Sequence, residues 1–357
     1  MVVEISELLE RLVKEGGSDL HISSNLPPAI RVDGKLKRME YPPLGPDDVE
    51  NLLFPMLSNE QRRRLEQEWE LDFSYGIEGL SRFRVNFYKD KGNYAAAFRT
   101  ITSKVPSFDQ LGLPEIVRTT AEKPRGLILV TGPTGSGKST TLAAMIDYIN
   151  STKAEHILTI EDPIEFVHSS KTSIVHQREL GMDTRSFANA LKSALREDPD
   201  IILVGEMRDH ETIALALTAA ETGHLVFGTL HTSSASQTVD RIIDVFPEGQ
   251  QQQIRVQLAN SLQAVFSQTL LPKLQPDGTK KGRVMAQEIM LVTPAIANLI
   301  REAKAAQIYS TIQMNQGMGM QTLEMALADL YKKKLISLED ALAKTSRPDE
   351  LKRMINT

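Results

Sequence analysis

The sequence contains no cysteine, and this absence removes several kinds of chemistry together. Disulfide bonds, thiolate nucleophiles and zinc sites with cysteine ligands are all excluded, and the lack of cysteine fits a reducing compartment. Long apolar runs are also missing, since none approaches the ~18 residues that a membrane-spanning helix needs. The N-terminal segment is interrupted by Glu4, Glu7 and Glu10, which is unlike a signal peptide. We therefore expect a protein that is peripheral to any membrane it contacts and does not span it.

A positive charge balance is lacking as well. The 41 Lys and Arg residues are outnumbered by 46 Asp and Glu residues, so the formal net charge is −5. Because nucleic acids are bound through basic surfaces, this balance disfavours a dedicated nucleic-acid binder, although a local basic patch is compatible with it. Hydrophobic residues at 41% and charged residues at 24% are ordinary for a globular protein. The length of 357 residues, at about 150 residues per domain, predicts two to three domains.

Residues 1–100 have the pattern of a small domain of mixed helices and strands. A helix is predicted at the start, where apolar residues recur at helical spacing: Ile5, Leu8, Leu9 and Leu12. Further on, apolar and polar residues alternate as in a half-buried strand, which places Arg82 and Arg84 together on the polar side. A turn at residues 90–92 would bring Arg99 near them, unless the register slips by one residue and turns Arg99 to the other face.

After a linker expected at residues 101–122, short apolar strands alternate with helices, and this core is expected to span residues 123–290. Its fold class is therefore α/β with a parallel sheet, and strands are predicted at 127–131, 157–160, 201–204 and 225–230. Beyond Pro247 we expect one helix that ends at Pro272, because apolar residues share one helical face: Ile254, Leu258, Leu262, Val265 and Phe266. A helical C-terminal section is expected over residues 291–357.

A glycine-rich motif directly follows the first strand of this core. It matches the pattern G-x-x-x-x-G-K-[ST] with Gly132, Pro133, Thr134, Gly135, Ser136, Gly137, Lys138 and Ser139, and Thr140 comes next. Glycines at these positions let backbone N–H groups close around phosphate oxygens at the start of a helix. Lys138 would reach the β- and γ-phosphates of a nucleotide, and the Ser139 hydroxyl would hold Mg²⁺. A glycine-rich turn without a ligand is a remote second interpretation.

Acidic and imidazole side chains follow the other three strands. Glu206 comes after the strand at 201–204, where Gly205 stands at the position of the usual Mg²⁺-linked Asp, so Glu206 would orient the attacking water or accept its proton. Glu161 and Asp162 follow a second strand, and His231 follows a third as a candidate γ-phosphate sensor. Because ligands bind at the carboxyl ends of parallel strands, these groups are expected at one edge of the sheet. The alternative for Glu206 is a surface carboxylate with no chemical role.

His224 and three arginines do not follow the carboxyl ends of these strands. His224 and His231 are separated by about 23 Å of strand, at ~3.3 Å per residue, so they cannot share a metal ion, and the plain interpretation of His224 is a satisfied polar residue. Arg82, Arg84 and Arg99 are either a solvated strand face or arginines that reach the nucleotide of a neighbouring subunit.

Together these motifs resemble the secretion ATPase superfamily, and within it the type IV pilus retraction branch. Residues 159–165 resemble its Asp box, residues 204–209 its atypical Walker B motif, and residues 222–232 its His box. The resemblance covers essentially the whole chain, because residues 18–21 and 27–34 are similar to the N-terminal domain of the family. It implies a PAS-like N-terminal α+β domain and a RecA-like P-loop ATPase domain.

The resemblance also implies an activity, roles and partners. The expected protein is a cytoplasmic homohexameric motor that binds ATP and Mg²⁺ and drives pilus retraction and twitching motility. Glu206 would be the catalytic base, and the metal would be held by Ser139, Glu161 and Glu206, partly through water. Glu161 and Asp162 would contact metal or water, the nucleotide-binding set would include Thr140 and His224, and the arginine contacts would come from Arg82, Arg84 and Arg99. The expected partners are the inner-membrane platform protein at the pilus base and, as a further candidate, a paralogous retraction ATPase.

One motif departs from the retraction branch, and three other interpretations remain open. The family motif AIRNLIRE is matched by residues 295–302 with Ala297 in place of its Arg, so no role of that Arg is carried over. A pilus-assembly or type II secretion ATPase shares the nucleotide motifs, but such relatives usually have a longer N-terminal region and a tetracysteine zinc motif. A nucleic-acid motor is disfavoured by the charge balance, and a non-hydrolysing ATP-gated adaptor is disfavoured by the intact Lys138 and Glu206.

Overall fold

The computed structural model describes residues 4–32, 34–101 and 104–356, and the chain forms two compact units. The first unit comprises residues 1–104 and 163–167, and the second comprises residues 105–162 and 168–357. Residues 102 and 103 of the expected linker lie outside the described residues. Among the described residues, no helix is both long and apolar enough to cross a membrane.

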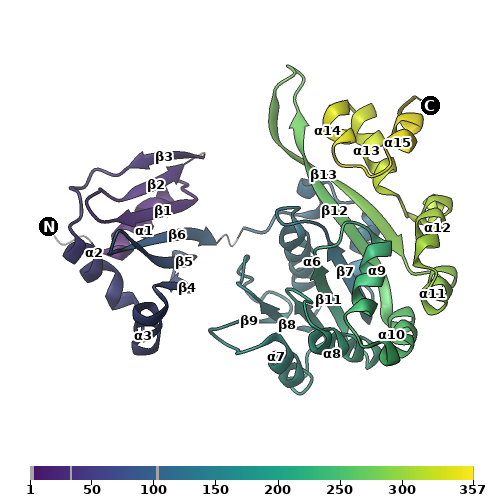
Figure 1. Cartoon of the computed structure of the whole chain (residues 1–357), viewed down its shortest axis with the longest axis horizontal. Coiled ribbons are helices and arrows are strands. Elements are labelled where there is room, and N and C mark those ends of the chain that lie inside the picture. Colours follow the sequence, from purple (N-terminus) through teal and green to yellow (C-terminus); the bar gives the residue numbers. More distant parts are fainter. Residues whose placement is uncertain (1–3, 33, 102–103, 357) are drawn as a thin grey trace. The chain divides into compact units, whose positions relative to one another are not determined.

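The first unit is built on a six-stranded antiparallel sheet in the order β3-β2-β1-β6-β5-β4 (Figure 1). Its strands are β1 Asp19–Ser23, β2 Ala29–Val32, β3 Lys35–Arg38, β4 Glu70–Ile77, β5 Ser81–Asp90 and β6 Asn93–Ile101. Its helices are α1 Ile5–Lys14, α2 Pro46–Leu53, the 3₁₀ turn η1 Phe54–Met56 and α3 Asn59–Glu68. The predicted first helix is confirmed, and it buries Leu8, Leu9 and Leu12 against the sheet core.

The β5–β6 hairpin settles the register that the sequence left open. Asp90 pairs with Asn93 across a two-residue turn in which Lys91 and Gly92 both have positive φ, at 52° and 85°. Such a turn matches the twist of the two strands. Arg84 is therefore directly opposite Arg99, and both lie on the same face of the sheet. Phe83, Val85 and Phe87 are buried on the other face, as the alternating pattern predicts.

The second unit is built on a seven-stranded sheet in the order β13-β12-β7-β11-β10-β8-β9, in which only β13 is antiparallel to its neighbour. The strands are β7 Gly126–Thr131, β8 His156–Glu161, β9 Ile174–Glu179, β10 Ile201–Val204, β11 Leu225–Leu230, β12 Leu262–Leu274 and β13 Lys280–Leu291. The four strands predicted from the apolar runs are confirmed as β7, β8, β10 and β11. They are consecutive neighbours in the sheet, so their carboxyl ends share one edge.

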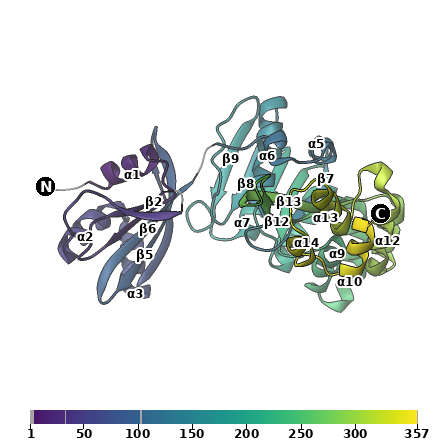
Figure 2. The ribbon, with the colours of Figure 1, turned by 90° about the horizontal axis from the view of Figure 1, so that it is seen from above.

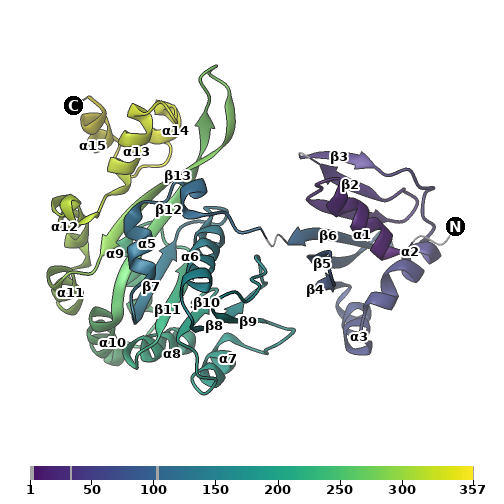
Figure 3. The same ribbon diagram turned by 180° about the vertical axis from the view of Figure 1, so that it is seen from behind.

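Helices cover both faces of this sheet (Figure 3). One face packs against α4 Phe108–Leu111, α5 Glu115–Ala121 and α6 Lys138–Thr152. The other packs against α7 Phe187–Ala194, α8 His210–Glu221, α9 Ala235–Asp244 and α10 Glu248–Ser261. Parallel strands that are buried on both faces are almost entirely apolar, and this is the reason that each of them is a short continuous apolar run in the sequence.

The long helix expected after Pro247 is wrong in its second half. Helix α10 ends at Ser261, and the next residues form strand β12, which includes Leu262, Val265 and Phe266. A continuous apolar run contains residues at helical spacing by necessity, so periodicity alone does not distinguish a buried strand from a buried helix. Pro272 lies within β12 beyond Ser267, the last residue that pairs with β7, so its missing N–H removes no bond to that strand.

The segment after β13 is helical. It comprises α11 Pro294–Arg301, η2 Ala305–Gln307, α12 Ile308–Met314, η3 Gln316–Met318, α13 Leu323–Lys332, α14 Leu338–Leu342 and α15 Pro348–Asn356. Helices α13, α14 and α15 gather beside the β12–β13 hairpin and share an apolar core with Leu271 and Ala286 (Figures 1 and 2). Ala297 of the altered motif is buried in α11, together with Ile296 and Ile300.

Candidate functional site

The glycine-rich loop connects β7 to the N-terminus of α6. Three of its glycines adopt positive φ, with Gly132 at 140°, Gly135 at 77° and Gly137 at 88°. A side chain at Gly132 would place its Cβ 2.2 Å from the carbonyl oxygen of Gln268, so glycine is required there on steric grounds. Gly137 caps α6, and the residues from Pro133 to Gly135 are exposed. This arrangement presents backbone N–H groups to an anion at the start of a 15-residue helix.

The base of the loop is held by Gln268 of β12, which is only 3% exposed. Its Nε2 donates to the backbone oxygen of Ser136 at 3.0 Å, and its Oε1 accepts from Thr141 Oγ1 at 3.1 Å. Gln287 of β13 donates to the same Oε1 at 3.1 Å. The sequence interpretation missed Gln268 because it assigned this segment to a helix. A glutamine inside an apolar strand run is the signal that marks it, since buried amides need partners.

Lys138 and the hydroxyl residues lie in the first turn of α6. The Lys138 ammonium donates to the carbonyl oxygens of Gly132 and Pro133, at 2.9 and 3.2 Å. It is therefore held over the loop that the sequence assigns to phosphate. Ser139 and Thr140 follow it in the helix and are partly exposed.

Glu206 is held between two basic side chains just beyond β10. Its Oε2 lies 2.6 Å from Arg208 Nη2, and its Oε1 lies 3.2 Å from His231 Nε2. The ion pair with Arg208 holds the pKa of the Glu206 carboxyl below its ordinary value, and His231 acts in the same direction. Arg208 was not singled out from the sequence, although it is only two residues from Glu206.

Steric contacts explain why a glycine, Gly205, precedes Glu206. A Cβ on Gly205 would lie 3.0 Å from the carbonyl oxygen of Ile160 and 3.1 Å from Cα of Glu161. The Gly205 N–H also donates to that Ile160 oxygen at 2.7 Å. An aspartate is therefore disfavoured at this position, and the carboxylate is supplied one residue later by Glu206.

Glu161 ends β8, the strand next to β10. Its Oε1 accepts from Thr159 Oγ1 at 2.6 Å and from Gln177 Nε2 at 3.1 Å. Asp162 follows as an exposed residue, and its charge acts on Arg208. Because β7, β11, β10 and β8 are neighbours, the groups that follow these strands lie along one edge of the sheet, as the sequence predicts.

The remaining candidates do not follow the carboxyl ends of these strands. His224 precedes β11, at the opposite end of that strand from His231, and its Nδ1 contacts the Ala219 carbonyl oxygen at 3.0 Å. Arg82, Arg84 and Arg99 belong to the first unit, where Arg99 Nε pairs with Asp19 Oδ1 at 2.9 Å.

The donor set fits Mg²⁺ bound together with a nucleotide. No group of three or more His, Cys, Asp or Glu side chains within the described residues is arranged to hold a metal ion. Mg²⁺ in phosphate-transfer sites keeps several waters and uses one or two protein ligands besides the substrate phosphates. The Ser139 hydroxyl and the carboxylates of Glu161 and Glu206 are oxygen donors of the kind that would suit such an ion.

A phosphate loop between a strand and a helix of an α/β sheet defines a P-loop protein. The chain belongs to the family of Type II/IV secretion system proteins, whose model matches residues 2–342. It is 56% identical over 347 residues, 97% of this chain and 99% of the relative, to the type IV pilus retraction ATPase PilT of Pseudomonas aeruginosa. It is 54% identical over 324 residues, 91% of this chain and 86% of the relative, to a twitching motility protein of Neisseria gonorrhoeae. The solved structure of the pilus retraction motor PilT with bound ADP matches it with a TM-score of 0.90 at 51% identity, covering 98% of this chain and 99% of that one.

Proposed function

We propose that this chain is an ATPase motor that hydrolyses ATP to drive type IV pilus retraction and twitching motility. The observation that carries the proposal is the 56% identity to the Pseudomonas aeruginosa retraction ATPase over almost the full length of both chains. The phosphate loop, the Glu206 carboxylate and His231 at one edge of the sheet supply the chemistry that such an enzyme needs.

Each residue at this edge has a role in the proposed reaction. Residues 132–140 surround the phosphates, and Lys138 leaves the loop carbonyls to contact the β- and γ-phosphates. Mg²⁺ would be held by Ser139, Glu161 and Glu206, partly through water, and would supply neutralisation of the phosphate charge. Glu206 accepts the proton of the attacking water, Glu161 and Asp162 orient water or metal, and His231 contacts the γ-phosphate.

The proposal extends to the assembly. We infer a homohexamer with a PAS-like domain at residues 1–100, a linker at 101–122, a RecA-like core at 123–290 and a helical section at 291–357. Arg82, Arg84 and Arg99 would reach the nucleotide of a neighbouring subunit, and His224 would join the nucleotide-binding set. The motor would act in the cytoplasm against the inner-membrane platform protein at the pilus base, with a paralogous retraction ATPase as a further partner.

The alternative function is that of a pilus-assembly ATPase, and one observation, the residue at position 297, favours it. Ala297 occupies the Arg position of the retraction motif, and it is buried in α11. The apolar residues Ile296 and Ile300 still pack, so the helix is retained and only a role of the missing guanidinium is lost.

The test replaces Glu206 by Gln in the native cell, with protein level checked. We expect ATP binding to be retained and turnover to fall by about 10²- to 10⁴-fold, because a general base is removed while the phosphate loop stays intact. Cells should then carry many surface pili and show no twitching. The matched control is Glu248→Gln on the exposed first turn of α10, which should leave pili and twitching unchanged.

Three other results would contradict the proposal. Cells without pili would assign the chain to pilus assembly, and unchanged cells would assign it to another system or to a redundant role. Loss of ATP binding by Glu206→Gln would remove the catalytic role assigned to Glu206.

A further inference from the structure

A short excursion of the chain separates β8 from β9. Residues 163–167 belong to the first unit, whereas the residues before and after them belong to the second. The excursion begins directly after Glu161 and Asp162 and ends at His168. One end of the excursion therefore follows directly after Glu161, a carboxylate of the candidate site, and the other end is His168.

One side chain bonds both ends of this excursion. Gln177 of β9 donates from Nε2 to Glu161 Oε1 at 3.1 Å, and its Oε1 accepts from the backbone N–H of His168 at 2.8 Å. Because one bond uses the amide nitrogen and the other the amide oxygen, the orientation of the amide is determined. Gln177 is opposite Thr159 in the parallel β8–β9 register, and Thr159 Oγ1 donates to the same Glu161 oxygen at 2.6 Å. Two donors from neighbouring strands thus converge on Glu161.

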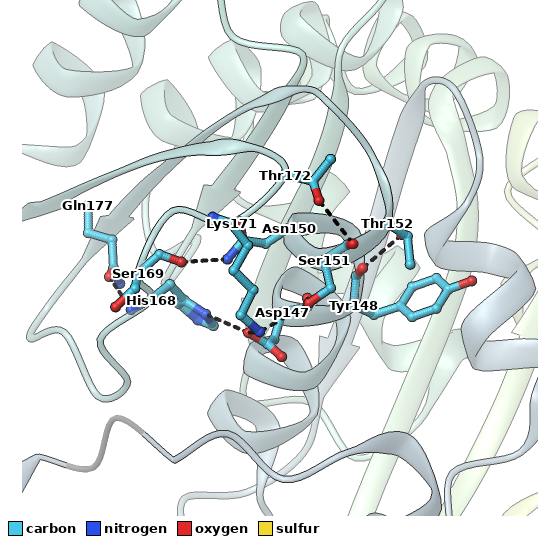
Figure 4. A network of polar contacts seen from close by, with 10 residues as sticks. All are labelled: Asp147, Tyr148, Asn150, Ser151, Thr152, His168, Ser169, Lys171, Thr172 and Gln177. Carbon is cyan, nitrogen blue, oxygen red and sulfur yellow. Dashed lines mark hydrogen bonds and ion pairs between the residues drawn. The ribbon is translucent and has the colours of Figure 1, made fainter.

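The returning end is anchored to α6, the helix that begins at Lys138. Asn150 is fully buried, its Oδ1 accepts from the Lys171 N–H at 3.0 Å, and its Nδ2 donates to the Ser169 oxygen at 2.8 Å. Lys171 Nζ forms an ion pair with Asp147 at 2.7 Å, and the His168 side chain is nearly buried beside it (Figure 4). The base of the excursion is therefore built on the phosphate-loop helix and on Gln177.

We propose that Gln177 is a positioning residue that orients Glu161 for Mg²⁺-nucleotide and ties this carboxylate to the excursion at residues 163–167. The inference rests on the proposed function, since it assigns Glu161 to the metal or its water. A shift of Glu161 on nucleotide binding pulls on the same amide that holds the His168 backbone. The nucleotide state is thereby transmitted to residues 163–167.

The proposal predicts that substitutions of Gln177 change the Mg²⁺-dependent part of ATP binding and the attachment of residues 163–167, and leave Mg²⁺-independent ATP binding unchanged. A glutamine with only a structural role would not produce this pattern. Losing the donor to Glu161 weakens metal-dependent binding, because outer partners of metal ligands commonly contribute about 10- to 100-fold. Losing the acceptor for His168 N–H releases the excursion from the site. Binding of ATP without Mg²⁺ depends on the phosphate loop and is expected to stay unchanged.

The experiment compares four variants of the full chain with the wild type. ATP affinity is measured in EDTA and in Mg²⁺, and hydrogen exchange of the peptide spanning residues 163–168 is measured with and without Mg²⁺-ATP. Gln177→Leu should keep the affinity in EDTA, lose about tenfold of the gain from Mg²⁺, and lose the ATP-dependent change in exchange. Thr159→Val, which removes the Thr159 donor to Glu161 and leaves Gln177 in place, should lose part of the Mg²⁺ gain and keep the exchange response.

Gln177→Glu keeps an acceptor for the His168 N–H and loses the donor to Glu161. It should therefore keep slow hydrogen exchange in residues 163–168 and lose the increase in ATP affinity that Mg²⁺ gives. If Gln177→Leu does not fold, Gln177→Glu tests the proposal in its place. Gln250→Ala, at an exposed position in the first turn of α10, is the matched control and should change neither readout. The inference is overturned if Gln177→Leu keeps both responses, or if ATP leaves the exchange of the wild-type excursion unchanged. A wild-type chain that fails to bind ATP would instead overturn the proposed function.

Discussion

Arg208 Nη2 lies 2.6 Å from Oε2 of Glu206, the carboxylate assigned to proton abstraction. This pair, supported by His231 on the other carboxylate oxygen, lowers the pKa of Glu206. The carboxylate is therefore ionised over the whole physiological range. Arg208 is exposed and can bind another anion, such as the phosphates of a nucleotide. When it does so, the ionised Glu206 carboxylate is released from the ion pair.

The first prediction concerns Arg208→Gln. Removing the guanidinium raises the pKa of Glu206 toward its ordinary value, so more of the base is protonated at low pH. The acid limb of kcat/KM for ATP hydrolysis should move to higher pH, with the activity near pH 8 less affected. The measurement is a pH profile from pH 5 to pH 9. Arg62→Gln on α3, where the arginine pairs with Glu66, is the control and should leave the profile unchanged. An unmoved acid limb in Arg208→Gln would show that the pair does not control the base.

The second prediction concerns the glycine at the start of the phosphate loop. Gly132→Ala would place Cβ 2.2 Å from the Gln268 oxygen and 2.6 Å from Ser136 Oγ, at a φ of 140°. Backbone strain and overpacking each cost about 1–3 kcal/mol, so the melting temperature should fall by several degrees or more. Gly249→Ala in α10 meets no atom within 4 Å and should be neutral or stabilising by up to about 1 kcal/mol. Equal melting temperatures for the two variants in calorimetry would contradict the steric argument.

The sequence predicts those parts of the molecule whose structure is determined by residues that are consecutive in the chain. The strands β7, β8, β10 and β11 and the loop from Gly132 to Ser139 carry their signals in consecutive residues. The register that brings Arg84 opposite Arg99 was left open by the sequence, and the two-residue turn at Lys91-Gly92 of the structure determines it.

What the sequence did not predict depends on contacts between distant segments. Gln268 lies 132 positions from Ser136, and Gln177 lies 16 positions from Glu161, so neither bond has a signature in a local window. Strand β12 was assigned to a helix because its identity depends on its place between β7 and β13. Polar residues inside apolar runs are the remaining signal, and Gln268 is an example.

The third prediction concerns the buried carboxyl of Glu288 on β13. This side chain is 4% exposed, its Oε1 accepts from the Ala235 N–H of α9 at 2.7 Å, and burial raises its pKa to about 7. A pKa that is higher in the folded state gives stability that is present at low pH and is lost as the pH rises from about 4.5 to about 7. Glu288→Gln removes this dependence and keeps an acceptor for Ala235.

Relative to wild type, the unfolding free energy of Glu288→Gln should therefore increase between pH 5 and pH 8 by about 3 kcal/mol, at about 1.4 kcal/mol for each pH unit in the window. Melting curves of both proteins at several pH values measure the difference. Gln250→Ala, at an exposed position of α10, is the control because it changes no titratable group, and its difference from wild type should stay nearly constant. A constant difference for Glu288→Gln as well would mean that Glu288 does not change its protonation within this range.

The last prediction asks whether the arginines of the first unit act in a neighbouring subunit. An arginine supplied in trans contributes about 10³- to 10⁵-fold to phosphoryl transfer, so Arg84→Ala should abolish measurable turnover while ATP binding is retained. Lys138→Ala should be inactive for a different reason, because it loses its phosphate contact. Mixed assemblies of the two variants contain interfaces where an intact Lys138 meets an intact Arg84, and these should recover ATPase activity. Arg64→Ala on α3 of the same unit should be active alone. If the mixture stays inactive although the subunits exchange, the arginine acts within its own chain or not at all.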